Sequence, residues 1–258
     1  MTKILFLGTS DSKGVPRLMC NCKVCQSQDA KNNRKRSSLL IKGEASTQLL
    51  IDISPDFKTQ YMNISKSIDH IPDVLVTHAH YDHIGGLGDF ADMSFCNHGN
   101  VSLISPPDII EMIVNRNPYL KNRDGLTFIS EYCWKFDQWM INFHKVNHGN
   151  NGYSYGIIFQ KNNYKWGYFS DAINLSPQEL EPMYDCDLLI LGTNYWDESE
   201  GSDRSVHDVQ EGLALKEKLR VKTMVLTHLS HEIEYYYHSA LLPDNVQFAF
   251  DGMEFEID

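Results

Sequence analysis

Three histidines and an aspartate lie close together in the segment THAHYDH, which follows an apolar run that predicts a buried strand. They are His78, His80, Asp82 and His83. Burying so many titratable side chains at the end of a strand is costly unless a metal ion uses them as ligands. The turn allows His78 and His80 to face one cation, and Asp82 and His83 a neighbouring cation. The segment therefore predicts a site for two metal ions.

Three more residues with ligating side chains stand where other predicted strands end, namely His148 after FHKVN, Asp171 after YFS and His228 after VLT. Each one alone is more typical of a turn or capping residue than of a ligand. Their repeated placement at strand ends favours a shared role in the two-metal site. Asp171 is the natural shared ligand, because two cations about 3.5 to 4 Å apart repel each other unless an anion lies between them.

A second group of ligating residues occurs near the start of the chain, where Cys20, Cys22 and Cys25 form the pattern CxCxxC. Structural zinc takes four ligands in a tetrahedron, so this run lacks one. Either the fourth ligand comes from far along the chain, or the run is a reactive or buried thiol cluster. The other cysteines are scattered, which favours a reduced, cytosolic protein over one held together by disulfides.

The composition is that of a globular protein with an excess of negative charge. Its 258 residues include 23 Lys and Arg against 34 Asp and Glu, which gives a net charge of −11. That balance argues against a long nucleic acid as the main partner and favours a small substrate. No break in composition divides the sequence, so we expect one domain over residues 1–258. Since no membrane span and no signal peptide are visible, we expect a cytoplasmic protein without a membrane partner, and a homodimer is left open.

The elements that must position these residues alternate between short apolar strands and helix-length segments. Strands are predicted over residues 3–8, 37–43, 47–54, 73–78, 101–105, 153–160, 164–171, 186–194 and 222–228, and residues 134–148 are rich in strand-forming residues. Helices are predicted to begin at Pro55, near Pro107 and at His207. Gly85 and Gly86 are expected to let the chain turn tightly before an amphipathic segment. Strands in both halves with helices outside them predict an α/β fold with two sheets packed face to face.

The pattern HxHxDH followed by two glycines, with a later His, Asp and His at strand ends, is similar to the metallo-β-lactamase superfamily. This resemblance spans nearly the whole chain and implies a four-layer αββα sandwich. More narrowly, the segments LGTSDSKGVPRLMCNCKVC, THLSH and FDGMEFEI resemble the PhnP-type phosphodiesterases of the carbon–phosphorus lyase pathway. Those proteins carry an extra zinc site, and the resemblance supplies His231 as the fourth ligand beside the three cysteines.

The same resemblance implies roles for the candidate residues. The implied ligand sets are His78, His80 and His148 for one cation, Asp82, His83 and His228 for the other, Asp171 between the two, and Cys20, Cys22, Cys25 and His231 for a structural zinc. Two divalent cations, zinc or manganese, are expected in the active site. The expected catalytic residues are Asp171 and His207, with His207 as the general acid for the leaving oxygen. Asp52 is expected to accept the free N–H of a ligating histidine.

The expected function is hydrolysis of a small phosphodiester, such as a ribose or nucleoside cyclic phosphate, through a bridging hydroxide. A tRNA 3′-processing endonuclease stays open as an alternative, although the net charge of −11 speaks against RNA. A non-catalytic, zinc-stabilised binding module also stays open, but it gives the second ligand set no purpose. Candidates for the substrate mouth are Asn194, Tyr195 and Trp196. The histidines expected to be structural or on the surface are His70, His98, His144 and His238.

Overall fold

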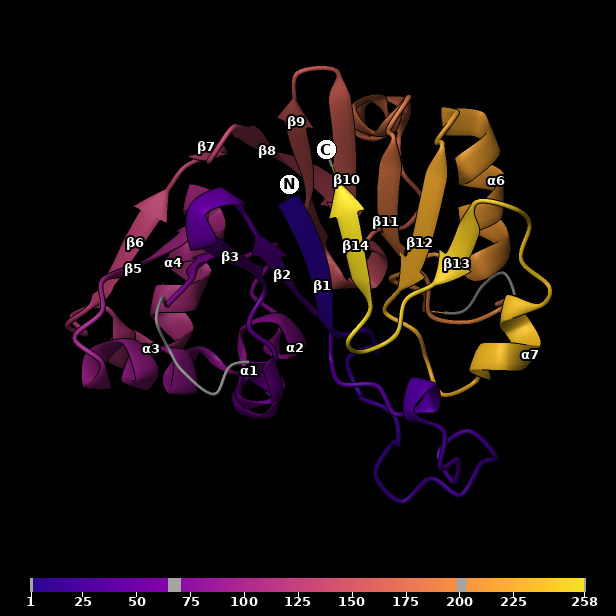
Figure 1. Cartoon of the computed structure of the whole chain (residues 1–258), viewed down its shortest axis with the longest axis horizontal. Coiled ribbons are helices and arrows are strands. Elements are labelled where there is room, and N and C mark those ends of the chain that lie inside the picture. Colours follow the sequence, from indigo (N-terminus) through magenta and orange to yellow (C-terminus); the bar gives the residue numbers. More distant parts are fainter. Residues whose placement is uncertain (1, 65–70, 199–202, 258) are drawn as a thin grey trace.

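A computed structural model describes residues 2–64, 71–198 and 203–257. In this part of the chain two seven-stranded sheets face each other, and helices cover their outer sides (Figure 1). The strand order is β14-β1-β2-β3-β4-β5-β6 in the first sheet and β13-β12-β11-β10-β9-β8-β7 in the second. The α/β sandwich expected from the sequence is confirmed.

The first sheet consists of β1 (Thr2–Gly8), β2 (Ser38–Lys42), β3 (Gln48–Ile51), β4 (Asp73–Leu75), β5 (Val101–Ser105), β6 (Leu126–Ser130) and β14 (Glu254–Ile257). The second consists of β7 (Cys133–Phe136), β8 (Trp139–Asn147), β9 (Tyr153–Lys161), β10 (Tyr164–Phe169), β11 (Leu188–Gly192), β12 (Thr223–Thr227) and β13 (Val246–Phe248). The α-helices are α1 (Phe57–Ile64), α2 (Tyr81–Ile84), α3 (Leu87–Cys96), α4 (Pro107–Arg116), α5 (Pro177–Leu180), α6 (Val209–Leu219) and α7 (Tyr235–Ser239). Short 3₁₀ helices are η1 (Ala30–Asn32), η2 (Glu44–Ser46), η3 (Pro118–Leu120), η4 (Gly149–Asn151) and η5 (Glu181–Met183).

The strand β11 shows how the layers pack. Leu188 and Ile190 belong to the core between the two sheets, whereas Leu189 and Leu191 belong to the core under α6. Side chains alternate between the faces of a strand, so a strand covered on both faces must be apolar throughout. This explains why the sequence LLIL has no polar positions.

Parallel pairing brings several strand ends to the same edge of each sheet. β3, β4 and β5 are parallel neighbours in the first sheet, and β10, β11 and β12 are parallel neighbours in the second. The carboxyl ends of parallel strands are the usual place for binding sites in α/β folds. The loops that follow β4, β10 and β12 carry most of the predicted ligating residues, the loop after β3 carries Asp52, and His148 follows the antiparallel strand β8.

Some predicted boundaries differ from the structure. The ladder of β4 ends at Leu75, so the predicted strand over residues 73–78 continues as an extended loop into the histidines. Residues 134–148 form parts of two strands, because Asp137 has a left-handed backbone with φ of 50° and turns the chain between β7 and β8. The first helix begins at Phe57, two residues after Pro55. Among the described residues, no helix has both the length and the apolar character needed to cross a bilayer.

Candidate metal centre

His78, His80 and His148 bring their ring nitrogens together, with the three candidate ligand atoms within 4.8 Å of one another. Nε2 of His78 lies 3.0 Å from Nδ1 of His80. His78 and His80 come from the loop after β4, and His148 comes from the end of β8, so the first and second sheets both contribute. Burial lowers the pKa of His78 well below its ordinary value, and the neighbouring His83 adds to this shift. The imidazole of His78 is therefore neutral, which is the form that binds a metal.

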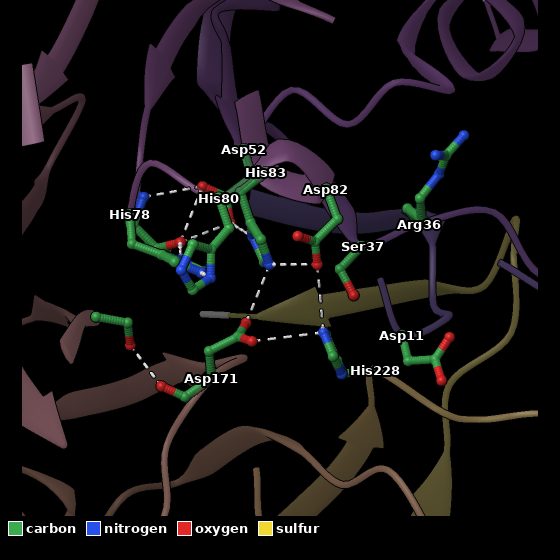
Figure 2. A network of polar contacts seen from close by, with 12 residues as sticks. Asp11, Arg36, Ser37, Asp52, His78, His80, Asp82, His83, Asp171 and His228 are labelled. Atoms are coloured by element: carbon green, nitrogen blue, oxygen red, sulfur yellow. Dashed lines mark hydrogen bonds and ion pairs between the residues drawn. The ribbon is translucent and has the colours of Figure 1, made fainter. Parts of the chain in front are cut away.

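Asp82, His83 and His228 form a second group of the same kind (Figure 2). Oδ2 of Asp82 lies 3.2 Å from Nε2 of His83 and 3.7 Å from Nε2 of His228. The short helix α2 places Asp82 and His83 in its first turn, and its N-cap residue is His80. One helical turn therefore divides the ligating residues of a single loop between two groups.

Asp171 lies between the two groups, at the end of the segment that follows β10 (Figure 2). Its carboxylate is 3.1 Å from Nε2 of His83, 3.5 Å from that of His228 and 3.6 Å from that of His148. Burial opposes ionisation of this carboxyl group, but the facing imidazoles of His228, His83 and His78 outweigh burial and hold the pKa of Asp171 well below its usual range. A permanently ionised carboxylate thus reaches residues of both groups.

Several buried polar atoms of this centre have no hydrogen-bond partner among the described residues. They include Nε2 of His83, Nε2 of His228 and Oδ2 of Asp171. Buried polar atoms without partners are costly, and ligation of a cation would satisfy all three. Their donor types, imidazole nitrogen and carboxylate oxygen, fit zinc or manganese. The residues present therefore fit the divalent cations that the ligand pattern predicts.

Carboxylates surround the ring of His83. Although burial disfavours the charged ring, Asp82, Asp171 and Asp52 raise the pKa of His83 well above its ordinary value. A position that attracts a proton so strongly also attracts a metal cation. Asp52 accepts a hydrogen bond of 2.7 Å from Nδ1–H of His83, which leaves Nε2 as the ligating atom. This is the contact that the sequence predicts for Asp52.

The other ligating histidines are oriented in the same way. Nδ1–H of His148 donates to the Ser205 carbonyl over 2.7 Å, and Nδ1–H of His228 donates to Oδ1 of Asn194 over 2.7 Å. Thr77 donates its hydroxyl hydrogen to Asp52, so its oxygen accepts from Nδ1–H of His78 at 3.0 Å. Sequence reasoning did not find these contacts with Thr77, Asn194 and Ser205, because each joins a ligand to a polar atom that no local pattern marks.

Backbone conformation at two positions supports the geometry. Asp52 and His228 have left-handed backbones, with φ of 61° and 59°. Such conformations are unfavourable for residues other than glycine and occur where surrounding structure holds them. Gly85 and Gly86 do not use this region, since their φ angles are −64° and −89°. The predicted turn at these two glycines is present, between α2 and α3, without a left-handed backbone. Instead, a Cβ on Gly86 would lie 2.3 Å from the carbonyl oxygen of Ser54, so glycine allows α2 to approach the loop after β3.

The cysteine run meets His231 in a separate cluster, as expected. Nδ1 of His231 lies 3.3 Å from Sγ of Cys20 and 3.5 Å from Sγ of both Cys22 and Cys25. Tetrahedral zinc with Zn–S of about 2.3 Å and Zn–N of about 2.05 Å requires S···N separations of about 3.6 Å. The four side chains therefore already have the spacing of a zinc site. All three cysteines are free of disulfides.

His207 is held at the same strand ends through its backbone. Its N–H donates to the carbonyl of Ala172, the residue after Asp171, and its carbonyl accepts from the N–H of Asn194, both over 3.0 Å. The side chain is buried, and Nε2 forms no hydrogen bond among the described residues. His207 thus has a ring nitrogen without a partner in the part of the chain that the structure describes, and a backbone bonded next to Asp171.

A cavity of about 170 Å³ opens beside His78 and His80. Its other lining residues are Ala79, Ile109, Met112, Arg116, Asn151, Gly152 and Tyr153. The guanidinium of Arg116 donates to the carbonyl of Ala79, in the loop that carries the histidines. The cavity combines an apolar wall from α4 with polar groups from the turn between β8 and β9.

The remaining predicted residues lie away from the two ligand groups or support them. Asn194 accepts a hydrogen bond from the ring of His228, and Trp196 packs on His238 with ring centroids 5.1 Å apart. His98 is exposed, His144 is half-buried, and His238 accepts a hydrogen bond from the backbone of Glu234. His70 lies outside the described residues.

Solved structures of other proteins are similar to this chain over nearly its whole length. A diphosphatase of the PhnP family has a TM-score of 0.87 and 25% identity, with 100% of this chain and 98% of that chain covered. The short form of human tRNase Z has a TM-score of 0.74 and 17% identity, with 99% of both chains covered, which shows a shared fold. The fold and the ligand groups support a metal-dependent hydrolase.

Sequence comparison agrees with the structural one. An octanoyltransferase of Porphyromonas gingivalis is 28% identical over 99% of this chain and 52% of its own length. The chain thus spans about half the length of that relative. A profile described as "Beta-lactamase superfamily domain" matches residues 47–229. Since this match covers more than half of the sequence, the chain belongs to the β-lactamase superfamily.

Proposed function

We propose that this protein is a two-metal phosphodiesterase that hydrolyses small, cyclic phosphodiesters. The observation that carries the proposal is the position of Asp171, whose carboxylate lies within 3.6 Å of imidazoles from both ligand groups. Two-metal hydrolases use a shared anion to hold cations about 3.5 to 4 Å apart, and they stabilise both the attacking and the leaving oxygen of a phosphodiester.

The ligand assignment follows the two groups. One divalent cation, zinc or manganese, is assigned to His78, His80 and His148, the other to Asp82, His83 and His228, and Asp171 is assigned to both. A third ion, a structural zinc, is assigned to Cys20, Cys22, Cys25 and His231. When bound, the two active-site cations supply a water of lowered pKa as nucleophile and polarise the phosphoryl oxygens.

The residues of the chain supply orientation and the proton. The hydrogen bonds from ring N–H groups to Asp52, Asn194 and the Ser205 carbonyl fix the imidazoles, so that Nε2 of each faces the centre. His207 donates a proton from Nε2 to the oxygen that leaves phosphorus, because an alkoxide is a poor leaving group unless it is protonated.

The size and charge of the molecule support a small substrate. The cavity beside the histidines, of about 170 Å³, has room for a compact group. A net charge of −11 disfavours a long polyanion, whose binding depends on neutralised phosphates. A cyclic diester gains further because ring opening relieves strain.

The proposal is tested by replacing His207 with alanine and comparing two leaving groups. Hydrolysis of a nucleoside 2′,3′-cyclic phosphate, with an alkoxide leaving group, should slow by about 10² to 10⁴ in His207→Ala. Hydrolysis of bis(4-nitrophenyl) phosphate should slow far less, since nitrophenolate needs little protonation. His98→Ala, which replaces an exposed histidine, is the matched control and should leave both rates unchanged.

Three outcomes would overturn parts of the proposal. Equal losses on both substrates would remove His207 from the role of general acid. Cleavage of pre-tRNA by the wild-type protein, with no hydrolysis of small diesters, would make it a processing nuclease. A protein that binds zinc but cleaves neither substrate class would be a binding module.

A further inference from the structure

The ring of His207 has one fixed nitrogen and one free nitrogen. Nδ1 lies 3.2 Å from Oε2 of Glu211, one helical turn further along α6, and Nε2 is buried without a hydrogen-bond partner in the described part of the chain. The backbone of His207 is bonded at both its N–H and its carbonyl, to Ala172 and Asn194. With the backbone fixed, rotation of the side chain decides where Nε2 points. The contact with Glu211 restricts that rotation.

Glu211 is itself held in place by a guanidinium. Arg204 donates to Oε1 over 2.9 Å and to Oε2 over 2.7 Å, which is the bidentate geometry that orients a carboxylate most firmly. The backbone N–H of Asp208 also donates to Oε2, over 3.1 Å. Arg204 is anchored in turn by Glu198 at 3.0 Å and by Asp208 at 3.2 Å. The carboxylate that faces His207 therefore has a fixed orientation.

The charged side chains around His207 are mostly acidic. Glu198, Asp208 and Glu211 contribute three negative charges and Arg204 one positive charge, so this cluster has a net charge of −2. His207 lies just before the first turn of α6.

Glu211 is ionised throughout the working pH range. The hydrogen bond with His207 lowers the pKa of Glu211 to about 2 against the effect of burial, and Arg204 adds to this shift. An ionised carboxylate at Nδ1 accepts a hydrogen bond only from Nδ1–H. In the neutral ring the single proton therefore sits on Nδ1, and a second, transferable proton must sit on Nε2.

We propose that Glu211, held by Arg204, is a positioning residue that turns Nε2 of His207 toward the leaving oxygen and stabilises the imidazolium that donates the proton. This inference rests on the proposed phosphodiesterase function. In the step, the bond from phosphorus to the leaving oxygen breaks, that oxygen takes the proton from Nε2, and His207 becomes neutral with Nδ1–H still bonded to Glu211. The proton released by the attacking water restores the imidazolium, so the overall reaction consumes only water.

Glu211 also has a structural role, which the test must separate from positioning. Together with Asp208 it forms a capping box at the start of α6. Glu211→Gln keeps a capping side chain of the same length, because glutamine serves in capping boxes as well as glutamate does. It removes the negative charge and the bidentate pair with Arg204. Glu217→Gln, an exposed position on the same helix, is the matched control.

The experiment compares these variants on the two leaving groups. In Glu211→Gln, kcat for the 2′,3′-cyclic phosphate should fall about 10- to 100-fold with KM changed less than about twofold, and kcat for bis(4-nitrophenyl) phosphate should fall less than about threefold. The alkaline limb of the kcat profile for the cyclic substrate should move about one pH unit lower, because the imidazolium loses its anionic partner. The double variant His207→Ala/Glu211→Gln should be no slower than His207→Ala, since the two residues act as one unit.

Equal losses on both substrates, an unshifted pH profile or additive losses in the double variant would reduce Glu211 to a helix cap. ¹⁵N NMR of the His207 ring shows which ring nitrogen is protonated. It therefore tests the contact with Glu211 independently of catalytic turnover. The wild-type neutral ring should carry its proton on Nδ1, and a ring protonated on Nε2 would overturn the inference even in an active enzyme. A protein with the Nδ1–H ring that hydrolyses no diester would instead overturn the proposed function and, with it, the proton-donating role.

Discussion

At the scale of single residues, the centre depends on histidine rings held by a hydrogen bond at Nδ1. That bond fixes the direction of Nε2, the nitrogen left free on the other side of the ring. Asp52 does this for His83, and Asn194 does it for His228. Asp171 differs from all of them, because its carboxylate faces the imidazoles of both ligand groups. A single substitution at Asp171 therefore separates the metal centre from the fold.

Asp171→Asn should lose at least one active-site cation and slow hydrolysis by more than about 100-fold. Replacing a residue that only orients a metal ligand lowers metal affinity or activity about 10- to 100-fold. Asparagine at position 171 also lacks the negative charge that holds two cations together. Metal content by elemental analysis and the rate on a small diester are the measurements. Asp185→Asn, at an exposed aspartate, is the control and should change neither. Full metal content and rate in Asp171→Asn would show that Asp171 is not shared.

At the scale of elements, the loop between β1 and β2 holds the segment that follows β12. The backbone N–H of Leu229 donates to Thr9 over 2.8 Å, and Arg34 donates to the carbonyls of Ser230 and Ile233 over 3.0 and 2.9 Å. The cluster of Cys20, Cys22, Cys25 and His231 joins the same loop to the same segment. Figure 1 shows this N-terminal loop extending from the edge of the sandwich. His228, with its left-handed backbone, is thus supported from a loop 200 residues away in sequence.

Cys22→Ser should therefore damage stability more than chemistry. Structural zinc contributes folding free energy directly, so a weakened site should lower the unfolding midpoint by at least about 5 °C, the equivalent of roughly 2 kcal/mol in a domain of this size. The folded, metal-loaded fraction should keep its rate within about tenfold. Calorimetry and zinc analysis measure the effect, with Cys96→Ser at an exposed cysteine as the control. An unchanged midpoint and zinc content in Cys22→Ser would contradict the link to His231.

The ion pair of Arg36 and Asp56, in the segments just before β2 and α1, predicts a pH dependence. Asp56 accepts hydrogen bonds from the backbone N–H, Nε and a terminal nitrogen of Arg36 at 2.9, 2.8 and 2.6 Å. Burial opposes ionisation, but these bonds lower the pKa of Asp56 below its ordinary value. A lowered folded-state pKa gives stability that is present above the unfolded pKa of about 4 and is lost as pH falls through the folded value.

Asp56→Asn should accordingly cost about 1 to 2 kcal/mol at pH 7, as a partly exposed, charge-assisted pair does. The difference in unfolding free energy from the wild type should stay constant down to about pH 5 and shrink below about pH 4. Urea unfolding at pH 7, 5 and 3.5 measures it. A difference that grows toward acid pH would have the opposite sign and would refute the role of the pair.

At the scale of the whole molecule, the centre forms where strand ends from the two sheets meet. This arrangement explains which residues of the site could be predicted from the sequence and which could not. His78 through His83 form a local pattern after a buried strand, the strand-end position of Asp171 linked it to that pattern, and the family resemblance linked His231 to the cysteine run. The contact of Asn194 with His228 joins two loops 34 residues apart and has no sequence signal. The left-handed backbones of Asp52 and His228 likewise have no signal in the sequence, because packing imposes them.

Other features were visible in part. The spacing of Asp208 and Glu211 is that of a capping box, so a helix start after His207 could be predicted, but the contact of Glu211 with the His207 ring could not. Gly85 and Gly86 were correctly marked as special, yet their reason is close approach to the loop after β3 and not a positive φ. Local patterns therefore identify which residues matter, and tertiary packing decides what each one contacts.

The proposed function requires two cations, with Asp171 as their shared ligand, for hydrolysis of a small diester. The most direct test is the rate of hydrolysis of a nucleoside 2′,3′-cyclic phosphate as zinc or manganese is added stepwise to protein that retains only the zinc of the cysteine cluster. We expect a negligible initial rate that rises and saturates at about two equivalents per chain. Saturation at one equivalent, or no hydrolysis of any small diester at full loading, would contradict the proposed function.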